Sequence, residues 1–334
     1  MAPSRAMAST RRRRRASRSG KRASRSSDPA RRDGAPGFLW LLYIPNSLEI
    51  SMSSPKSFVE LLTPTASAPG ELQFEISEDW LQGRSAFGGL QAALALAAMR
   101  QLTGVTAPLR VLQTTFMAPV PQGVVSLRAQ VLRAGKSVTH VEARIEAEGQ
   151  TLALFVGVFG AGRPSAIVVP MAVPALPEKG PEGLRDLPFA RGIAPNFLQY
   201  YAMRWAEGGW PFSNTPGATT RIWLKSREAA PSVAQFGEHA AELALVALAD
   251  AIPSPAISWL KTPAPASSLT WTLELIEPAP APDDAQRFGV GHDYWRIDSE
   301  IHSAKEGYIA QTAIVHSPDN RPVALSRQSV VIFA

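Results

Sequence analysis

The sequence predicts an α+β fold that is built twice along one chain, and three observations indicate it. Two Ala/Leu-rich segments, residues 90–102 and 239–251, have the composition of buried helices. Each is followed by segments with the alternating pattern of β-strands, and the whole plan recurs at an offset of about 160 residues. A Pro-rich stretch, residues 163–195, separates the two copies. One long helix followed by an antiparallel meander is typical of α+β domains.

Both predicted helices are apolar on nearly all sides. The first follows Gly88-Gly89, and its only polar members are Gln91, Arg100 and Gln101. The second contains only two acids, Glu242 and Asp250. Because a helix without a polar face must be covered all round, we expect both to be buried.

The strand-like segments have similar lengths and turns in the two copies. A twisted sheet wrapping a central helix would bury the helix and one sheet face, which is the hotdog arrangement. Two such units would pair edge to edge, since this removes two exposed edges. We therefore predict a double hotdog with strands at 109–117, 124–133, 138–147 and 151–159, then at 219–226, 268–276, 294–302, 308–316 and 323–333, and with the counterpart of 219–226 near 73–80.

Four segments follow from this plan. Residues 1–51 form a basic tail, 52–162 the N-terminal hotdog, 163–195 a linker and 196–334 the C-terminal hotdog. The tail carries a net charge of +9 and the rest −3, so the basic isoelectric point does not describe the folded body. Such a tail is expected to be disordered, and it fits a transit peptide, a nucleic-acid-binding arm or an over-extended start before Met52. We expect no nucleic-acid-binding face on the body.

Several classes of function lack their sequence signals. There is no cysteine, so a thiolate metal site and a cysteine nucleophile are excluded. The apolar run 38–44 is too short to span a membrane, and we expect none of the chain to do so. No phosphate-binding glycine loop or serine nucleophile elbow is present, and the five histidines show no metal-binding spacing. We predict no cofactor and no metal, and interpret the aromatic segment 197–223 as packing rather than an acyl tunnel.

Four stretches of the body resemble the acyl-CoA thioesterase II group of double-hotdog thioesterases. The likeness extends from about residue 71 to 333, and it rests on the order and spacing of the four stretches. The stretches are GRSAFGG at 83–89, LRAGKS at 132–137, LAD at 248–250 and VALSRQ at 323–328. The resemblance implies an acyl-CoA thioester hydrolase of fatty acid metabolism. It also implies a homo-oligomer, and the absence of cysteine fits a reducing compartment, so we expect a cytoplasmic location.

The same resemblance implies that a bound water, not a side chain, attacks the thioester. An aspartate, a hydroxyl residue and a glutamine hold this water, which assigns catalytic roles to Asp250, Ser268 and Gln328. Serine stands where the family usually has threonine, and Ser267 and Thr270 stay open as alternatives for the hydroxyl. Gly88 and Gly89 are predicted to admit the substrate next to the backbone, although tight helix–sheet packing would explain them equally well.

The chemistry of these residues fits without the analogy. A carboxylate in an apolar helix needs hydrogen-bond donors, and burial raises its pKa towards the range of a general base. The alternative is that Asp250 faces solvent at the helix end. A glutamine amide both donates and accepts, as a water-holding group must, although on an edge strand Gln328 would be an ordinary surface residue. Two other functions stay open: a non-catalytic acyl-CoA binder and an acyl-CoA hydratase.

Overall fold

The computed structural model describes residues 54–173, 175, 180–277 and 293–334. The predicted tail, its apolar run 38–44 and the alternative start at Met52 lie outside the described residues. The described residues all belong to one compact unit, residues 39–334.

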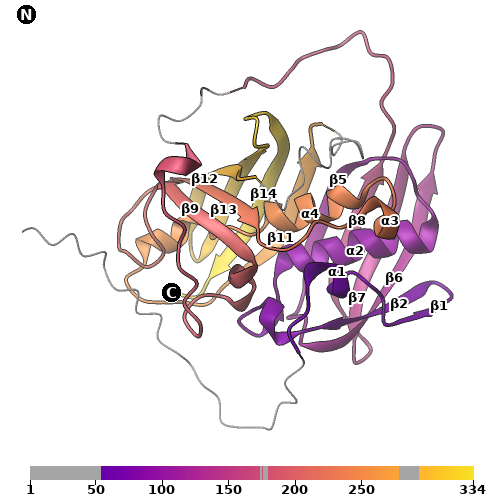
Figure 1. The fold of residues 1–334 in the computed structure, drawn as a ribbon, viewed down its shortest axis with the longest axis horizontal. Helices are drawn as coiled ribbons and strands as arrows, with labels where there is room; N and C mark the ends of the chain where they lie inside the picture. Colours follow the sequence, from indigo (N-terminus) through magenta and orange to yellow (C-terminus); the bar gives the residue numbers. More distant parts are fainter. Residues whose placement is uncertain (1–53, 174, 176–179, 278–292) are drawn as a thin grey trace, which may run out of the picture. The chain divides into compact units, whose positions relative to one another are not determined.

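The main feature of the fold is one antiparallel sheet that runs through both halves of the chain (Figure 1). Its order is β1-β2-β6-β7-β8-β5-β11-β14-β13-β12-β10-β9, so the second half mirrors the first across the β5–β11 pair. This is the edge-to-edge pairing that was predicted because it removes two exposed sheet edges. The strands are β1 (Ala66–Ala68), β2 (Glu71–Ile76), β5 (Leu109–Phe116), β6 (Gly123–Ala134), β7 (Thr139–Ala147), β8 (Gln150–Phe159), β9 (Tyr201–Glu207), β10 (Thr219–Ser226), β11 (Ala266–Leu275), β12 (Trp295–Lys305), β13 (Tyr308–His316) and β14 (Pro322–Ile332); β3 (Leu81–Gln82) and β4 (Ser85–Ala86) form a separate small pair.

The strands β1, β3, β4 and β9 were not predicted, and the first three have only two or three residues. β9 lies at the end of the sheet beside β10, inside the segment that we interpreted as aromatic packing. Its first three residues, Tyr201, Ala202 and Met203, are all buried, and the N–H of Leu187 donates to Met203 O at 2.8 Å. A strand buried on both faces does not alternate, so its period is hidden.

Both long helices are present at nearly the predicted positions. α2 (Gly88–Thr103) begins at the glycine pair and ends at Gly104, which adopts the left-handed conformation of a helix C-terminus. α4 (Ala240–Ala249) ends one residue before Asp250. The shorter elements are α1 (Phe58–Leu61), α3 (Val233–Phe236), η1 (Glu78–Trp80), η2 (Pro181–Gly183), η3 (Asn196–Tyr200) and η4 (Pro255–Trp259).

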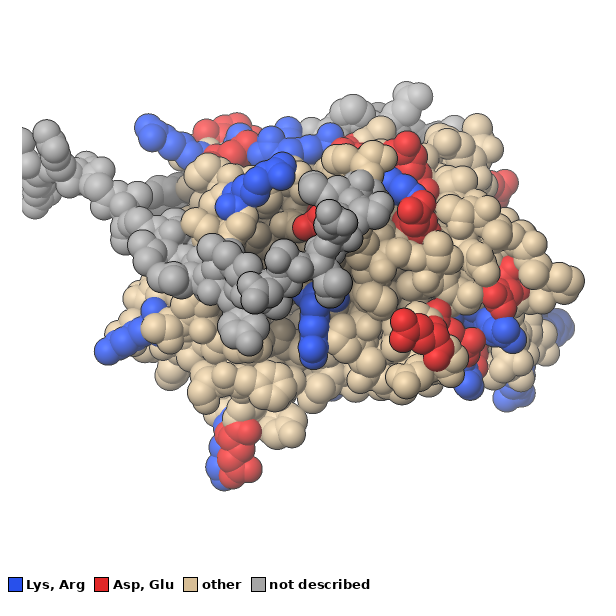
Figure 2. Space-filling model, turned by 90° about the horizontal axis from the view of Figure 1, so that it is seen from below, with Lys and Arg blue, Asp and Glu red and all other residues tan. Residues whose placement is uncertain are grey.

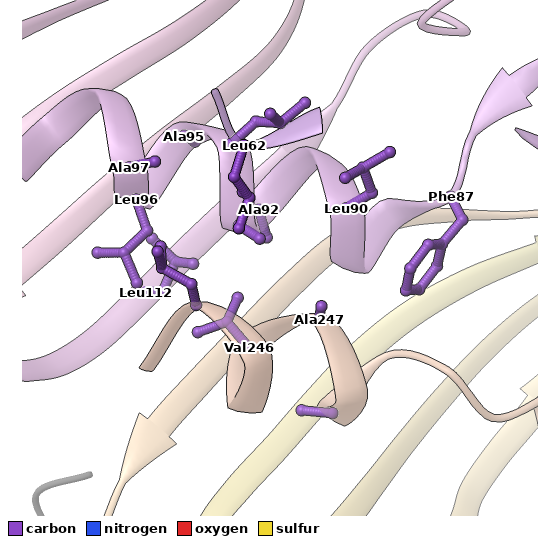
Figure 3. Close-up of a cluster of buried hydrophobic side chains, with 14 of the residues drawn as sticks. Leu62, Phe87, Leu90, Ala92, Ala95, Leu96, Ala97, Leu112, Val246 and Ala247 are labelled. Atoms are coloured by element: carbon purple, nitrogen blue, oxygen red, sulfur yellow. The ribbon is translucent and has the colours of Figure 1, made fainter. Parts of the chain in front are cut away.

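α2 and α4 pack against each other in opposite directions, with alanines and leucines between them (Figure 3). At one end, a Cβ on Gly89 would lie 2.4 Å from Ala247 O, so only glycine allows the helices to approach this closely. At the other end, Arg100 forms an ion pair with Glu242, which is wholly buried. Glu242 also accepts the N–H of Leu109 at 3.1 Å. The antiparallel arrangement brings the start of α2 to the end of α4.

Most buried apolar side chains of both halves form one continuous hydrophobic cluster, which includes α2, α4 and strands from each half; Ala256, Ile309 and Val330 form a small separate one. The aromatic segment contributes to it: Phe197 stacks on Phe87 with ring centroids 4.1 Å apart, and Tyr201 meets the same ring edge-on at 6.3 Å. These contacts support the packing interpretation of that segment. The described part of residues 163–195 contains η2 and no strand.

Candidate active site

Asp250 lies at the junction of the two halves, where α4 ends against the start of α2. α4 stops here because Pro253 and Pro255 follow and cannot continue a helix. Phe87, the residue that precedes α2, makes no side-chain cap for the first N–H groups of that helix. The Asp250 carboxylate takes this place and accepts the N–H of Gly89. A negative charge at a helix N-terminus is favoured by the helix dipole.

The two glycines at the start of α2 make room for this carboxylate. A Cβ on Gly88 would lie 2.6 Å from Asp250 Oδ2 and 3.0 Å from the ring of Phe116. Gly89 is in contact with the backbone of α4 and uses its N–H on Asp250. Close packing, one of the two roles predicted for the glycine pair, is therefore observed. The group that lies against the pair is the Asp250 carboxylate.

Gln328 holds the other side of the carboxylate. Its Nε2 donates to Asp250 Oδ1 at 2.5 Å. Its Oε1 accepts from Gln311 Nε2 at 2.9 Å, and Gln311 Oε1 in turn accepts from Ser254 Oγ at 2.5 Å. The result is a continuous chain of hydrogen bonds that leads from the loop after α4, across β13 and β14, to Asp250.

Sequence reasoning missed Gln311 and Ser254. A signal for Gln311 was available, because strand 308–316 alternates and Gln311 is the one polar residue at the inward positions, with Ile309, Ala313 and Val315 as the others. An amide among buried apolar positions requires polar partners. Nothing in the sequence singles out Ser254, which meets Gln311 only through the fold.

Ser268 shares a sheet face with Gln328, and the two alternative hydroxyls do not. Ser268 pairs with Val330, whereas Thr270 pairs with Ser329 and Ser267 with Val331. Directly paired residues point to the same face, and Val330 has the same parity as Gln328. A β-bulge between Ser268 and Thr270 makes the difference, since the extra residue turns Ser268 inward. Among the described residues the Ser268 side chain has no hydrogen-bond partner.

A small cavity of about 10 Å³, enough for about one water molecule, lies beside this group. Small side chains on three adjacent strands, Ser299, Ala313 and Ser326, form its floor, and Ile252 borders it next to Asp250. The Ser299 hydroxyl is buried and has no hydrogen-bond partner in the described part of the chain. The cavity is therefore bounded by Asp250, both glutamines and a row of short side chains.

Burial dominates the electrostatics of the site. It raises the pKa of the Asp250 carboxyl to about 7, against the hydrogen bonds from Gln328 and the Gly89 N–H, which lower it. Tyr201 lies close enough for the Asp250 charge to raise its pKa, after burial as the larger cause. The alternative in which Asp250 simply faces solvent does not hold, because its carboxylate is hydrogen-bonded to the Gly89 N–H of α2 and to Gln328 of β14.

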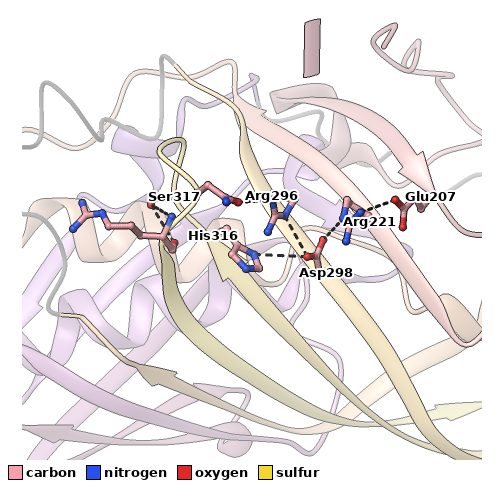
Figure 4. Close-up of polar contacts among 8 residues, drawn as sticks. Glu207, Arg221, Arg296, Asp298, His316 and Ser317 are labelled. Atoms are coloured by element: carbon pink, nitrogen blue, oxygen red, sulfur yellow. Dashed lines mark hydrogen bonds and ion pairs between the residues drawn. The ribbon is translucent and has the colours of Figure 1, made fainter. Parts of the chain in front are cut away.

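A second group of charges lies on the opposite face of the sheet (Figure 4). Arg221 binds Glu207 at 2.5 Å and Asp298 at 2.9 Å, and the buried Arg296 lies 3.2 Å from Asp298. Burial and the Arg296 charge lower the pKa of His316 to about 4, so this histidine is neutral at pH 7. The acids and arginines neutralise one another, which gives the group a structural role.

The other observations concern metals, membranes and nucleic acids. Figure 2 shows acidic and basic side chains interspersed on one face of the molecule, without a broad basic area. Within residues 54–173, 175, 180–277 and 293–334, no three His, Asp or Glu side chains are grouped as a metal site would need. No helix in that same part of the chain has the length and apolarity to cross a membrane.

Comparison with solved structures gives the class of fold. A hotdog-fold protein of unknown function from Alicyclobacillus acidocaldarius is similar with a TM-score of 0.70 and 22% identity, over 83% of this chain and 98% of that one. The tesB protein of Mycobacterium avium subsp. paratuberculosis has a TM-score of 0.66 and 13% identity, over 83% and 98%. The acyl-CoA thioesterase II TesB2 of Mycobacterium marinum has 0.62 and 14%, over the same shares. These likenesses establish a hotdog-type fold.

The family follows from the sequence models. Residues 76–160 match the acyl-CoA thioesterase N-terminal domain, and residues 175–332 match the acyl-CoA thioesterase C-terminal domain. The chain belongs to the acyl-CoA thioesterase family. The resemblance to this family is thereby confirmed. Comparison with curated proteins found no match.

Proposed function

We propose that this protein hydrolyses the thioester bond of an acyl-coenzyme A at Asp250. The observation that carries the proposal is the carboxylate itself: it is held by hydrogen bonds between α2 and β14, desolvation raises its pKa to about 7, and it borders a cavity. A group with such a pKa is charged in part at neutral pH and still basic enough to take a proton from water. We also propose that the fold is a double hotdog whose halves are joined by the segment 163–195.

In the proposed reaction Asp250 removes a proton from a bound water while the water oxygen attacks the thioester carbonyl carbon. The tetrahedral intermediate then collapses, the C–S bond breaks, and coenzyme A leaves as a thiolate that takes up a proton. A free fatty acid is the other product. No metal or cofactor is required for this chemistry.

Gln328 and Ser268 are proposed to orient the water. One N–H of the Gln328 amide is used on Asp250, which leaves the second N–H for the water or the carbonyl oxygen. Ser268 is a diagonal neighbour of Gln328 on the same face, and the Cα atoms of such neighbours are about 7–8 Å apart, so that the two side chains can reach a common water. Its half-buried hydroxyl has the free donor and acceptor capacity that this requires.

The glycine pair is proposed to position the substrate. Because Gly88 carries no side chain, the backbone at the start of α2 lies against Asp250 Oδ2, and the thioester is proposed to bind next to this contact. The N–H of Gly89 is already used on Asp250. Stabilisation of the developing oxyanion is therefore assigned to the other free N–H groups in the first turn of α2.

The rate should rise with pH through about 7. Only the charged carboxylate accepts a proton, and burial places its pKa near 7. Below that value the base is neutral and the rate falls about tenfold per pH unit; above it the rate levels off. The measurement is kcat/KM for an acyl-CoA from pH 5 to pH 9 with free-thiol detection. A flat profile across this range would contradict the role of Asp250.

The cavity over Ser299, Ala313 and Ser326 has room for about one water, and it is proposed to hold the attacking water beside Asp250. Ala313→Leu should fill it and lower kcat/KM for every acyl-CoA by roughly tenfold or more, because the general base loses the water on which it acts. Ala310→Leu is the matched control, because Ala310 is exposed on the other face of the same strand. A loss confined to longer acyl chains would contradict this use of the cavity.

The alternatives make different predictions. A non-catalytic binder would take up acyl-CoA and release no thiol, and a hydratase would act on an enoyl-CoA double bond with the thioester intact. A homo-oligomeric state, a cytoplasmic location and a place in fatty acid metabolism stay predictions.

A further inference from the structure

The hydrogen bonds around Gln328 have a fixed direction. A carboxylate only accepts hydrogen bonds, so the Gln328 NH₂ group must face Asp250, and Oε1 must face the other way. There Oε1 meets Gln311 Nε2 at 2.9 Å. Gln311 can present its NH₂ group because its own oxygen accepts from Ser254 Oγ, a hydroxyl donor, at 2.5 Å.

We propose that Gln311, held by Ser254, is a positioning residue that locks the Gln328 amide in the orientation that directs its NH₂ group at Asp250. Gln311 is opposite Gln328 in the β13–β14 pair, and its side chain is nearly buried. A flipped Gln328 would bring two NH₂ groups together at Gln311 and leave a buried donor unpaired, which is costly. This inference rests on the proposed function of Asp250.

The fixed orientation of the Gln328 amide matters because Asp250 changes its charge during the proposed reaction. Once protonated, the carboxyl group can donate to an amide oxygen, and a freely turning Gln328 would offer one. That bond would stabilise the neutral acid and hold back the proton that must be released in each turnover. With Gln311 in place, Gln328 offers only a donor, so the charged base is favoured.

Few other groups act on the charge of Asp250. From α2 it meets the backbone of Gly88 and Gly89, and from β14 it meets Gln328. The titratable group that senses its charge is Tyr201 on β9, whose pKa is raised and which therefore stays neutral over the working pH range. A change in the titration of Asp250 can thus be assigned to the glutamine pair.

The test is Gln311→Met, which nearly keeps the side-chain volume and removes both hydrogen-bonding groups. We expect the pKa of Asp250 to rise by about one unit, because the neutral acid gains an acceptor. It is measured by ¹³C NMR of the carboxyl carbon in the full chain. The kcat profile should shift upward by the same amount, with a loss near pH 7 of roughly fivefold that largely recovers at pH 9.

Two further variants keep the test decisive. Ser254→Ala releases Gln311 and should shift the same titration in the same direction by less, even where Gln311→Met does not fold. Gln130→Met, at an exposed amide on β6, is the control and should shift nothing. An unchanged pKa in both site variants, or an equal loss of rate at every pH, would overturn the positioning role.

The NMR titration separates this inference from the proposed function. The wild-type protein could lack hydrolytic activity while the pKa of Asp250 still rises in Gln311→Met. This result would end the thioesterase proposal and leave the positioning role of Gln311 standing. Normal hydrolysis by the wild-type protein, together with an unchanged pKa of Asp250 in Gln311→Met, would support the thioesterase proposal and contradict the positioning role of Gln311.

Discussion

Replacing Asp250 with asparagine is expected to abolish hydrolysis, with kcat lowered about 10³-fold, within the range that a general base contributes. An amide cannot take a proton from water, while its size and shape match the carboxyl group. The measurement is thiol release from an acyl-CoA at pH 8, where the wild-type carboxylate is charged. Acyl-CoA binding, followed by calorimetry, should persist.

The control for this experiment is Asp319→Asn. Asp319 lies in the turn between β13 and β14, where it binds Arg321 at 2.6 Å, and its removal should leave kcat within about twofold, as for an exposed ion pair. Thermal unfolding of both variants checks that the fold is kept. Wild-type turnover in Asp250→Asn would remove Asp250 from the mechanism and with it the proposed site.

Gly89→Ala is expected to give the largest loss of stability. The added Cβ would lie 2.4 Å from Ala247 O and 2.5 Å from the ring of Phe87. The first atom is backbone in α4, and the second belongs to a ring already stacked on Phe197, so neither can yield cheaply. We expect a cost of about 3 kcal/mol or more, at the upper end of overpacking effects.

This cost should appear in both stability and activity. The melting temperature should fall by roughly 6–12 °C in a domain of this size. Since Ala247 lies three residues before Asp250, pushing α4 away also moves the carboxylate, and kcat should fall in the folded fraction. Gly217→Ala is the matched control, because nothing lies within 4 Å of its added Cβ. Equal melting temperatures for the two variants would contradict the tight helix contact.

The chemistry of the candidate site was visible in the sequence in part. Asp250 stood out as an acid in an apolar helix, and Gln328 came from a resemblance to a known family. The orientation of Ser268 was not predictable, because it depends on a bulge whose extra residue is defined only by pairing with β14. Gln311 and Ser254 lie 57 residues apart and contact each other only in the folded chain.

The sequence by itself determined the elements and their repetition. Local patterns carry this information: apolar helices without a polar face, alternating strands and turn residues between them. β9 was the longest strand that the sequence did not predict, since burial on both faces removes the alternation. β1, β3 and β4 were also missed, because two or three residues are too few to show a period. Tertiary structure alone decided what Asp250 meets. Its hydrogen bonds to the start of α2 and to β14, and the desolvation that raises its pKa, arise from segments far apart in the chain, and no local pattern encodes such distances.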